Sequence, residues 1–236
     1  MEEDLSYIKR NWEKVKEEID RVASRIGRDK EKIEVVAVAK GCPSSYVREA
    51  FLSGIKFIGE NRVQEAEKKI NELKDLPIEW HLVGHLQRNK VKKAVKLFSL
   101  IHSVDSVPLA LELNKEGERL GKRIKILIQF NTSGEPSKFG FKEEEFFKNI
   151  DLLMGLKNLE ILGVMTIGPL TSDKNLIRES FRRLMKIRER FMKESGLDLP
   201  YISMGMSEDF QIAIEEGANL LRLGRIIFSK EFEVKI

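Results

Sequence analysis

The sequence predicts a single α/β domain that folds as a (β/α)8 TIM barrel, with one extra helix at the N-terminus. Eight short apolar segments alternate with amphipathic or charged segments along the 236 residues, and such alternation is typical of a parallel sheet. Eight units in a chain near ~250 residues favour a closed barrel. An open doubly wound sheet is the structural alternative, but its glycine-rich first turn is not found in Lys40-Gly41-Cys42-Pro43. We therefore expect residues 1–236 to form one barrel domain.

Composition excludes several classes of protein. Apolar residues make up 42% and charged residues 34% of the chain, which excludes a disordered protein, and no apolar run approaches the roughly 18 residues that a membrane helix needs. The acidic N-terminus lacks the features of a signal peptide, and Cys42 is the one cysteine, so we expect a cytoplasmic protein without a membrane partner. The net charge of +4 comes from interspersed charges of both signs, so no nucleic-acid partner is expected.

The secondary structure follows from the spacing of apolar residues. A leading helix is predicted over residues 3–26, because apolar residues recur there at spacings of three and four. Strands are predicted where short apolar runs end at glycine, proline or polar residues. These runs are residues 33–39, 56–59, 80–84, 100–104, 124–130, 159–165, 201–203 and 220–223. Helices are expected between them at 44–51, 62–74, 89–97, 106–120, 142–153, 173–195 and 208–217, and residues 230–236 are expected to form a tail.

The first predicted strand ends in Lys40, which is the first candidate for chemistry. Six of the seven residues before it are apolar, so the strand is expected to be buried on both faces. Burying an ammonium group costs several kcal/mol. A deprotonated amine avoids this cost and attacks carbonyl groups to form Schiff bases. The alternative is that Lys40 extends from the strand end into solvent.

Polar residues follow the other predicted strands as well, and in a barrel the chemistry gathers at these carboxyl ends. They are Asn61, His85, Asp105, Asn131, Thr166, Ser203, Ser207 and Arg222. The segment 203–208 offers two hydroxyl groups and a glycine, which is the chemistry of a phosphate site. Barrels often hold phosphate between the loops after strands seven and eight. A strand-end lysine beside such a site suits a phosphorylated aldehyde, either pyridoxal 5′-phosphate (PLP) or a sugar phosphate bound by a Schiff-base aldolase.

Seven segments, in order along almost the whole chain, resemble the pyridoxal phosphate homeostasis proteins (the YggS/PROSC family), single-domain relatives of the N-terminal barrel of alanine racemase. They are residues 36–40, 59–65, 80–87, 131–141, 163–167, 203–209 and 222–224. The resemblance implies that PLP is the cofactor and that it forms a Schiff base with Lys40. The other residues that it implies at the cofactor are Ser203 and Gly224 at the phosphate, Arg222 at the pyridine nitrogen, and Asn61, Met165 and Met206 lining the site.

The electronics of Arg222 favour cofactor holding over demanding chemistry. A guanidinium stays protonated and can only donate hydrogen bonds, so the pyridine nitrogen facing it stays unprotonated. The ring is then a weaker electron sink than one paired with a carboxylate. Two positions depart from the family pattern. Arg225 stands where relatives usually have a small hydroxyl residue, and Cys42, expected to be a filler or exposed thiol, belongs to an unusual pair with Gly41.

The sequence favours a carrier over an enzyme. Alanine racemase uses a second acid/base group, a tyrosine from another domain and the partner subunit, and none of Tyr7, Tyr46 and Tyr201 lies in a motif that resembles it. We therefore expect a protein that stores or delivers PLP, with PLP-dependent apoenzymes as partners, no catalytic residue and no metal. We expect a monomer. The alternatives are a PLP-dependent amino-acid racemase or transaminase, and the Schiff-base aldolase.

Overall fold

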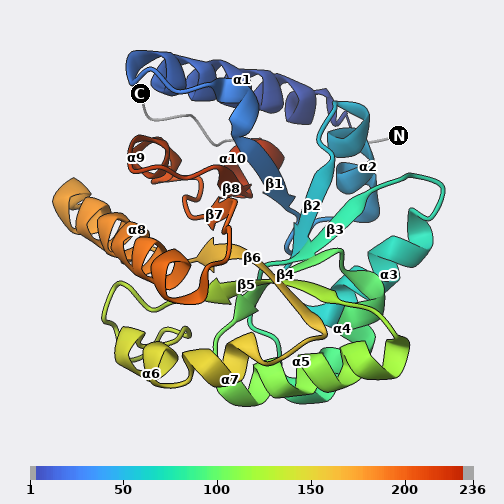
Figure 1. The fold of residues 1–236 in the computed structure, drawn as a ribbon. Helices are drawn as coiled ribbons and strands as arrows, with labels where there is room; N and C mark the ends of the chain where they lie inside the picture. Colours follow the sequence, from blue (N-terminus) through green and yellow to red (C-terminus); the bar gives the residue numbers. More distant parts are fainter. Residues whose placement is uncertain (1–3, 231–236) are drawn as a thin grey trace.

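The computed structural model describes residues 4–230, and its eight strands form a closed parallel barrel. Each strand pairs with the next one along the chain, and β8 pairs with β1 to close the barrel. The strands are β1 (Glu34–Val38), β2 (Phe57–Glu60), β3 (Glu79–Leu82), β4 (Leu100–Val104), β5 (Ile124–Gln129), β6 (Leu159–Met165), β7 (Tyr201–Ser203) and β8 (Leu220–Leu223). The helices surround this barrel (Figure 1). The predicted (β/α)8 architecture is confirmed.

Helical segments connect successive strands on the outside of the barrel. The α-helices are α1 (Ser6–Arg25), α2 (Ser44–Leu52), α3 (Val63–Glu72), α4 (Val91–Leu97), α5 (Val107–Leu120), α6 (Glu143–Lys148), α7 (Ile150–Met154), α8 (Lys174–Ser195), α9 (Phe210–Glu215) and α10 (Arg225–Phe228). Two single 3-10 turns, η1 (Lys30–Lys32) and η2 (Arg88–Lys90), precede β1 and α4. Most predicted helices are found within a few residues of their expected bounds.

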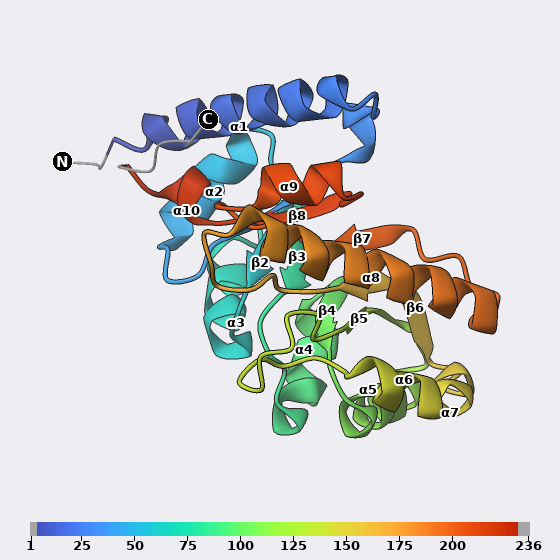
Figure 2. The same ribbon diagram turned by 90° about the vertical axis from the view of Figure 1, so that its left-hand side faces the viewer.

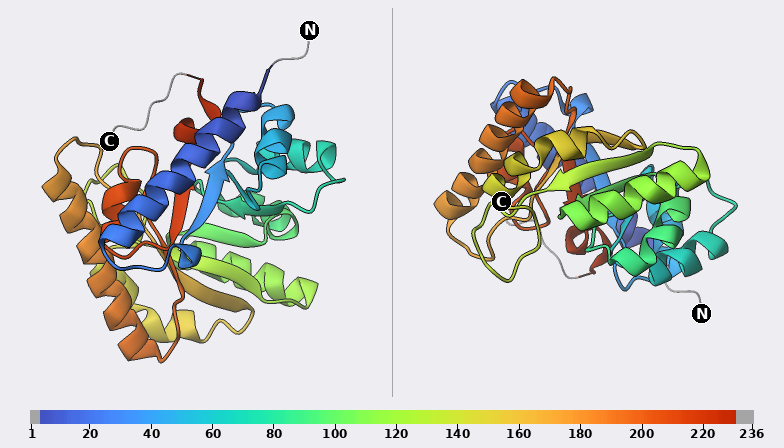
Figure 3. Two further views of the ribbon diagram at one scale, coloured as in Figure 1. Left: turned by 90° about the horizontal axis from the view of Figure 1, so that it is seen from above. Right: turned by 60° about the horizontal axis from the view of Figure 1, so that its bottom comes forward.

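The extra helix α1 lies across one side of the barrel, over α2, α9 and α10 (Figures 2 and 3). Its apolar stripe is buried there, with Ile8 and Val15 fully covered. Tyr7 also contributes, because its hydroxyl donates to the carbonyl oxygen of Phe228 at 3.2 Å. The predicted leading helix is thus present, although it begins at Ser6, and residues 1–3 lie outside the described part.

The structure differs from the prediction in two helices. The helix expected at 142–153 is divided into α6 and α7 at Asn149, whose side-chain amide donates to the carbonyl oxygen of Glu145 at 2.9 Å. Such side-chain to backbone bonds compete with the helical pattern. No helix was predicted between the last strand and the tail, and the structure has the short helix α10 there, which begins at Arg225. Of the expected tail, residues 231–236 lie outside the described part.

The core has two layers, one between barrel and helices and one inside the barrel. The inner layer contains Val36, Val83, Leu100, Leu127, Met165 and Leu220. The strands also bury polar residues, among them His81, His102, Ser203 and Arg222. Buried polar groups need hydrogen-bond partners, and the partners of these four define the site. Within residues 4–230, no helix is both long and apolar enough to span a membrane.

Candidate functional site

A cavity of about 610 Å³ opens at the carboxyl ends of β1, β2 and β3. Its lining residues are Lys40, Asn61, Arg62, Val63, Gln64, Glu65, Gly84, His85, Gln87 and Lys90. Two predicted site residues, Lys40 and Asn61, are therefore in one place. The Lys40 side chain is exposed and lines this cavity. The expectation of a lysine buried by its strand is wrong, because the strand ends at Val38, two residues earlier.

A buried ion pair fixes the backbone immediately before Lys40. The ammonium group of Lys69, on α3, donates to the carbonyl oxygen of Ala39 at 2.6 Å and to Glu60 Oε1 at 2.5 Å. Burial raises the pKa of Glu60, and the Lys69 ammonium opposes that rise. Sequence reasoning missed this pair, although the charged Glu60 at the end of an apolar run was a signal.

Arg222 is the second cation of the site, and it is buried. It extends from β8 with only 4% of its surface exposed. Its Nη1 donates to Ser203 Oγ at 2.7 Å and its Nη2 to the carbonyl oxygen of Thr166 at 2.8 Å. Burial lowers the pKa of Arg222 to about 10, and Asp209 opposes this effect, so the guanidinium is charged at neutral pH. Within residues 4–230 it forms no ion pair, and two of its five N–H donors have protein acceptors.

Ser203 links Arg222 to two histidines inside the barrel. Ser203 Oγ lies 2.9 Å from His102 Nδ1, and His102 Nε2 lies 3.1 Å from His81 Nδ1. Burial lowers the pKa of His81 to about 4, and burial with the nearby His81 and Arg222 holds the pKa of His102 well below its usual value. Both imidazoles are therefore neutral at pH 7. Sequence reasoning did not assign either histidine to the site, although each interrupts an apolar strand.

The loop after β7 brings a different serine to Gly224. Ser207 Oγ accepts from the backbone N–H groups of Gly224, at 3.4 Å, and Ile226, at 3.3 Å. The loop is tied to β8 because the Arg222 backbone N–H donates to the Gly205 carbonyl oxygen at 2.9 Å. Gly205 has a φ of +94°, and a Cβ atom there would lie 2.6 Å from the Ala213 side chain. Glycine is thus required for this approach of the loop to α9.

The two predicted methionines lie in different surroundings. Met165 is fully buried in the inner layer of the barrel, whereas Met206 is 38% exposed in the loop after β7. The Met206 backbone N–H donates to Asp209 Oδ1 at 2.5 Å. Arg225 points its Nη2 at Glu208 Oε1, 2.8 Å away, and both side chains are exposed. The single thiol, Cys42, is partly buried against the core, and burial raises its pKa.

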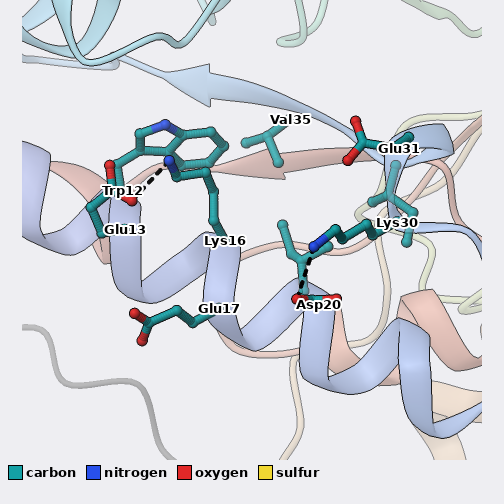
Figure 4. A pocket seen from close by; sticks show the side chains of 10 residues that line it. Trp12, Glu13, Lys16, Glu17, Asp20, Lys30, Glu31 and Val35 are labelled. Carbon is teal, nitrogen blue, oxygen red and sulfur yellow. Dashed lines mark hydrogen bonds and ion pairs between the residues drawn. The ribbon is translucent and has the colours of Figure 1, made fainter.

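A second cavity, of about 380 Å³, lies between α1 and the start of β1 (Figure 4). Trp12 lines it, and the Lys16 ammonium lies 5.7 Å from the centroid of the Trp12 ring. Its two lysines are paired with carboxylates, Lys16 with Glu13 at 2.8 Å and Lys30 with Asp20 at 2.9 Å. It contains none of the predicted site residues. The candidate site is therefore the barrel mouth.

Comparison with known proteins agrees with this fold and identifies the family of the chain. The family model "Alanine racemase, N-terminal domain" matches residues 4–231. The pyridoxal phosphate homeostasis protein of Aquifex aeolicus is 39% identical over 217 residues, which cover 92% of this chain and 95% of the relative. The human protein of the same name is 37% identical over 230 residues, covering 92% of this chain and 84% of the relative.

Solved structures of similar proteins have the same barrel fold. The structure of PipY from Synechococcus elongatus with PLP bound has a TM-score of 0.81 and 36% identity, covering 90% of this chain and all of that one. An alanine racemase of Clostridium difficile has a TM-score of 0.75 at 16% identity, covering 95% of this chain and 56% of that one, which shows a likeness of fold. The chain belongs to the pyridoxal phosphate homeostasis protein family, whose barrel is that of the alanine racemase N-terminal domain.

Proposed function

We propose that this protein holds PLP as a Schiff base on Lys40 and serves intracellular PLP homeostasis by storing the cofactor and delivering it to apoenzymes. The family name and the PLP bound to PipY support the ligand. The observation that carries the proposal is Arg222. A buried guanidinium without a carboxylate partner in the described residues is costly, and a ligand with a hydrogen-bond acceptor repays that cost.

The side chains of Lys40 and Arg222 fit the aldehyde and the pyridine nitrogen of PLP. The exposed amine of Lys40 is open to an aldehyde, and the Schiff base forms between its Nζ and the aldehyde carbon with loss of one water. Arg222 follows on the neighbouring strand, since β8 pairs with β1 in a register that places Arg222 beside Val36. Its unused N–H donors suit the pyridine nitrogen. PLP supplies the site with an electrophilic carbon and an electron-withdrawing ring.

For the phosphate we favour Ser207 with Gly224 over the predicted pair of Ser203 and Gly224. Ser203 exposes no surface, and its single hydroxyl hydrogen is committed to His102 while its oxygen accepts from Arg222. A phosphate has acceptors only, so it needs donors that are free to turn toward it. The Ser207 hydroxyl meets this need, because its oxygen accepts from the backbone N–H groups of Gly224 and Ile226 and its own hydrogen can rotate toward a phosphate. In this assignment Ser203 binds Arg222 and not the phosphate. Asn61 and Met206 remain proposed lining residues of the PLP site.

The positions of the tyrosines support a carrier over a racemase. Tyr7 and Tyr46 lie on α1 and α2, with ring centroids 6.3 Å apart. Tyr201 begins β7, at the end of the barrel opposite the mouth. None of the three lines the cavity that contains Lys40, so no phenol stands opposite the amine as a second acid/base group. The aldolase alternative is not favoured by the family to which the chain belongs.

The test is borohydride reduction of the PLP-loaded protein, followed by peptide mapping by mass spectrometry. We expect a reducible visible absorption band and one modified peptide, containing Lys40. Lys40→Ala should abolish both, whereas Lys90→Ala, which changes another lysine of the same cavity, should preserve them. In parallel, incubation with L-alanine and chiral analysis should give no more D-alanine than free PLP does.

Three outcomes would overturn parts of this proposal. A colourless protein that takes up no added PLP would remove the ligand assignment. A modified lysine other than Lys40, retained in Lys40→Ala, would move the attachment point. Formation of D-alanine that requires Lys40 would replace the carrier with the racemase.

A further inference from the structure

A chain of hydrogen bonds crosses the barrel interior and ends at Arg222. It joins four strands, from His81 on β3 and His102 on β4 to Ser203 on β7 and Arg222 on β8. All four side chains are at most 5% exposed, so water does not compete for these contacts. His81 also stacks on the ring of Phe57, with centroids 5.0 Å apart and planes 27° from parallel. The far end of the chain is thereby held in place.

The guanidinium fixes the direction of the first bond in this series, and burial of Ser203 fixes the next one. Arg222 can only donate, so Ser203 Oγ accepts from it, and His102 Nδ1 is the acceptor within reach of the buried serine hydrogen. His102 must then carry its proton on Nε2 and donate it to His81 Nδ1. Both rings are neutral, as shown above, and each is confined to one tautomer. Each histidine therefore accepts one hydrogen bond at its Nδ1 atom, in a series of hydrogen bonds that begins at the Arg222 cation.

The same contacts hold the guanidinium on two sides. Ser203 Oγ receives Nη1 and the carbonyl oxygen of Thr166 receives Nη2. Thr166 is itself held, because its hydroxyl donates to the carbonyl oxygen of Phe130 at 2.9 Å. Both acceptors are uncharged, so they orient the cation without neutralising it. An oriented, charged donor favours a ligand atom with a lone pair and disfavours a ligand atom that carries a positive charge.

We propose that His102, acting through Ser203, is a positioning residue that fixes Arg222 as a donor toward the pyridine nitrogen, so that the site selects rings whose nitrogen has a lone pair. This inference rests on the proposed binding of PLP. It identifies the interior histidines as the source of a ligand selectivity, separate from attachment at Lys40.

The experiment compares the dissociation constants of PLP and of its N-methylpyridinium analogue, which has the same aldehyde and phosphate but no lone pair. Both are measured by absorbance titration. The wild-type protein should bind the analogue roughly 100-fold more weakly, since it loses a charge-assisted hydrogen bond and brings two positive charges together. His102→Leu should reduce this ratio to about 10-fold, because Ser203 loses its acceptor and Arg222 its fixed orientation. His102→Asn should restore most of the ratio, because its side-chain oxygen can accept from Ser203.

A second variant protects the test against a folding defect in His102→Leu. Ser203→Ala removes the acceptor of Arg222 but keeps both histidines, and it should reduce the ratio as well. The matched control is Ser195→Ala, which removes a serine hydroxyl on α8 that donates to the Phe191 carbonyl oxygen at 2.7 Å and lies outside this hydrogen-bond network. It should leave the ratio unchanged. Thermal unfolding of each apoprotein establishes that it is folded.

The two proposals fail in different ways. If the wild-type protein binds neither compound, the proposed function is overturned. If it binds PLP but the ratio is the same in wild type, His102→Leu and Ser203→Ala, His102 does not position Arg222. A wild-type ratio near one would also overturn this inference while leaving PLP binding intact.

Discussion

Lys69 and Arg222 are both buried cations near the barrel mouth, and they are held in opposite ways. Lys69 has a carboxylate partner, Glu60, at 2.5 Å. Arg222 has a serine hydroxyl and a backbone carbonyl oxygen as its protein acceptors. Breaking a buried ion pair leaves an uncompensated charge, whereas removing a cation with neutral partners does not. The difference separates a cation that stabilises the fold from one that is available to a ligand.

The largest effect is expected from Glu60→Gln, which leaves the Lys69 ammonium buried without a counter-charge. The free energy of unfolding should fall by about 3–5 kcal/mol, measured by guanidinium denaturation of the apoprotein. The control is Glu65→Gln, whose partner Arg62 lies 3.3 Å away with both side chains exposed. It should change stability by less than about 1 kcal/mol. Equal effects of the two variants would contradict the structural role of Lys69.

An intermediate effect is expected from pH, through the neutral histidines beside Arg222. The unfolded chain protonates each imidazole near pH 6.5, whereas burial lowers the pKa of His81 in the folded protein to about 4. Between these values the unfolded state binds more protons, so stability decreases as the pH falls. The loss due to His81 should be about 1.5 kcal/mol between pH 6.5 and 5, and His102 acts in the same direction. The raised pKa values of Glu60 and Asp209 act in the opposite direction.

The contribution of His81 is isolated by comparing how steeply the free energy of unfolding changes with pH in different variants. Denaturation curves at several pH values between 5 and 7 should show a smaller acid loss for His81→Asn than for the wild type. His85→Asn, which changes a partly exposed histidine paired with Asp105, is the matched control. An unchanged slope in His81→Asn would mean that this imidazole is protonated in the folded protein.

The smallest effect on stability is expected from Arg222→Leu. This change removes two hydrogen bonds but also the cost of burying a guanidinium without a carboxylate. The apoprotein should therefore unfold with a free energy within about 2 kcal/mol of the wild-type value. A loss as large as that of Glu60→Gln would erase the contrast between the two cations and indicate that Arg222 is part of a structural ion network.

Features that depend on local sequence pattern were predicted accurately, whereas features that depend on particular side-chain contacts were not. The strands at 100–104, 159–165, 201–203 and 220–223 are found at their expected bounds, because apolar runs and their terminating residues are local signals. The helix at 142–153 was predicted as one piece, since the side-chain bond of Asn149 to Glu145 is not visible as periodicity. The site was predicted as a set of strand ends, and the structure brings Lys40 and Asn61 together there.

The sequence by itself determined the number and order of the strands and the family, since these depend on local pattern and on motifs in order. The tertiary structure alone decided which cation is buried and which serine meets Gly224. His102 and Ser203 are 101 residues apart in the chain, yet their side chains are hydrogen-bonded. Such partnerships arise only when the barrel closes and β8 pairs with β1. Burial, pKa and hydrogen-bond direction all follow from that closure.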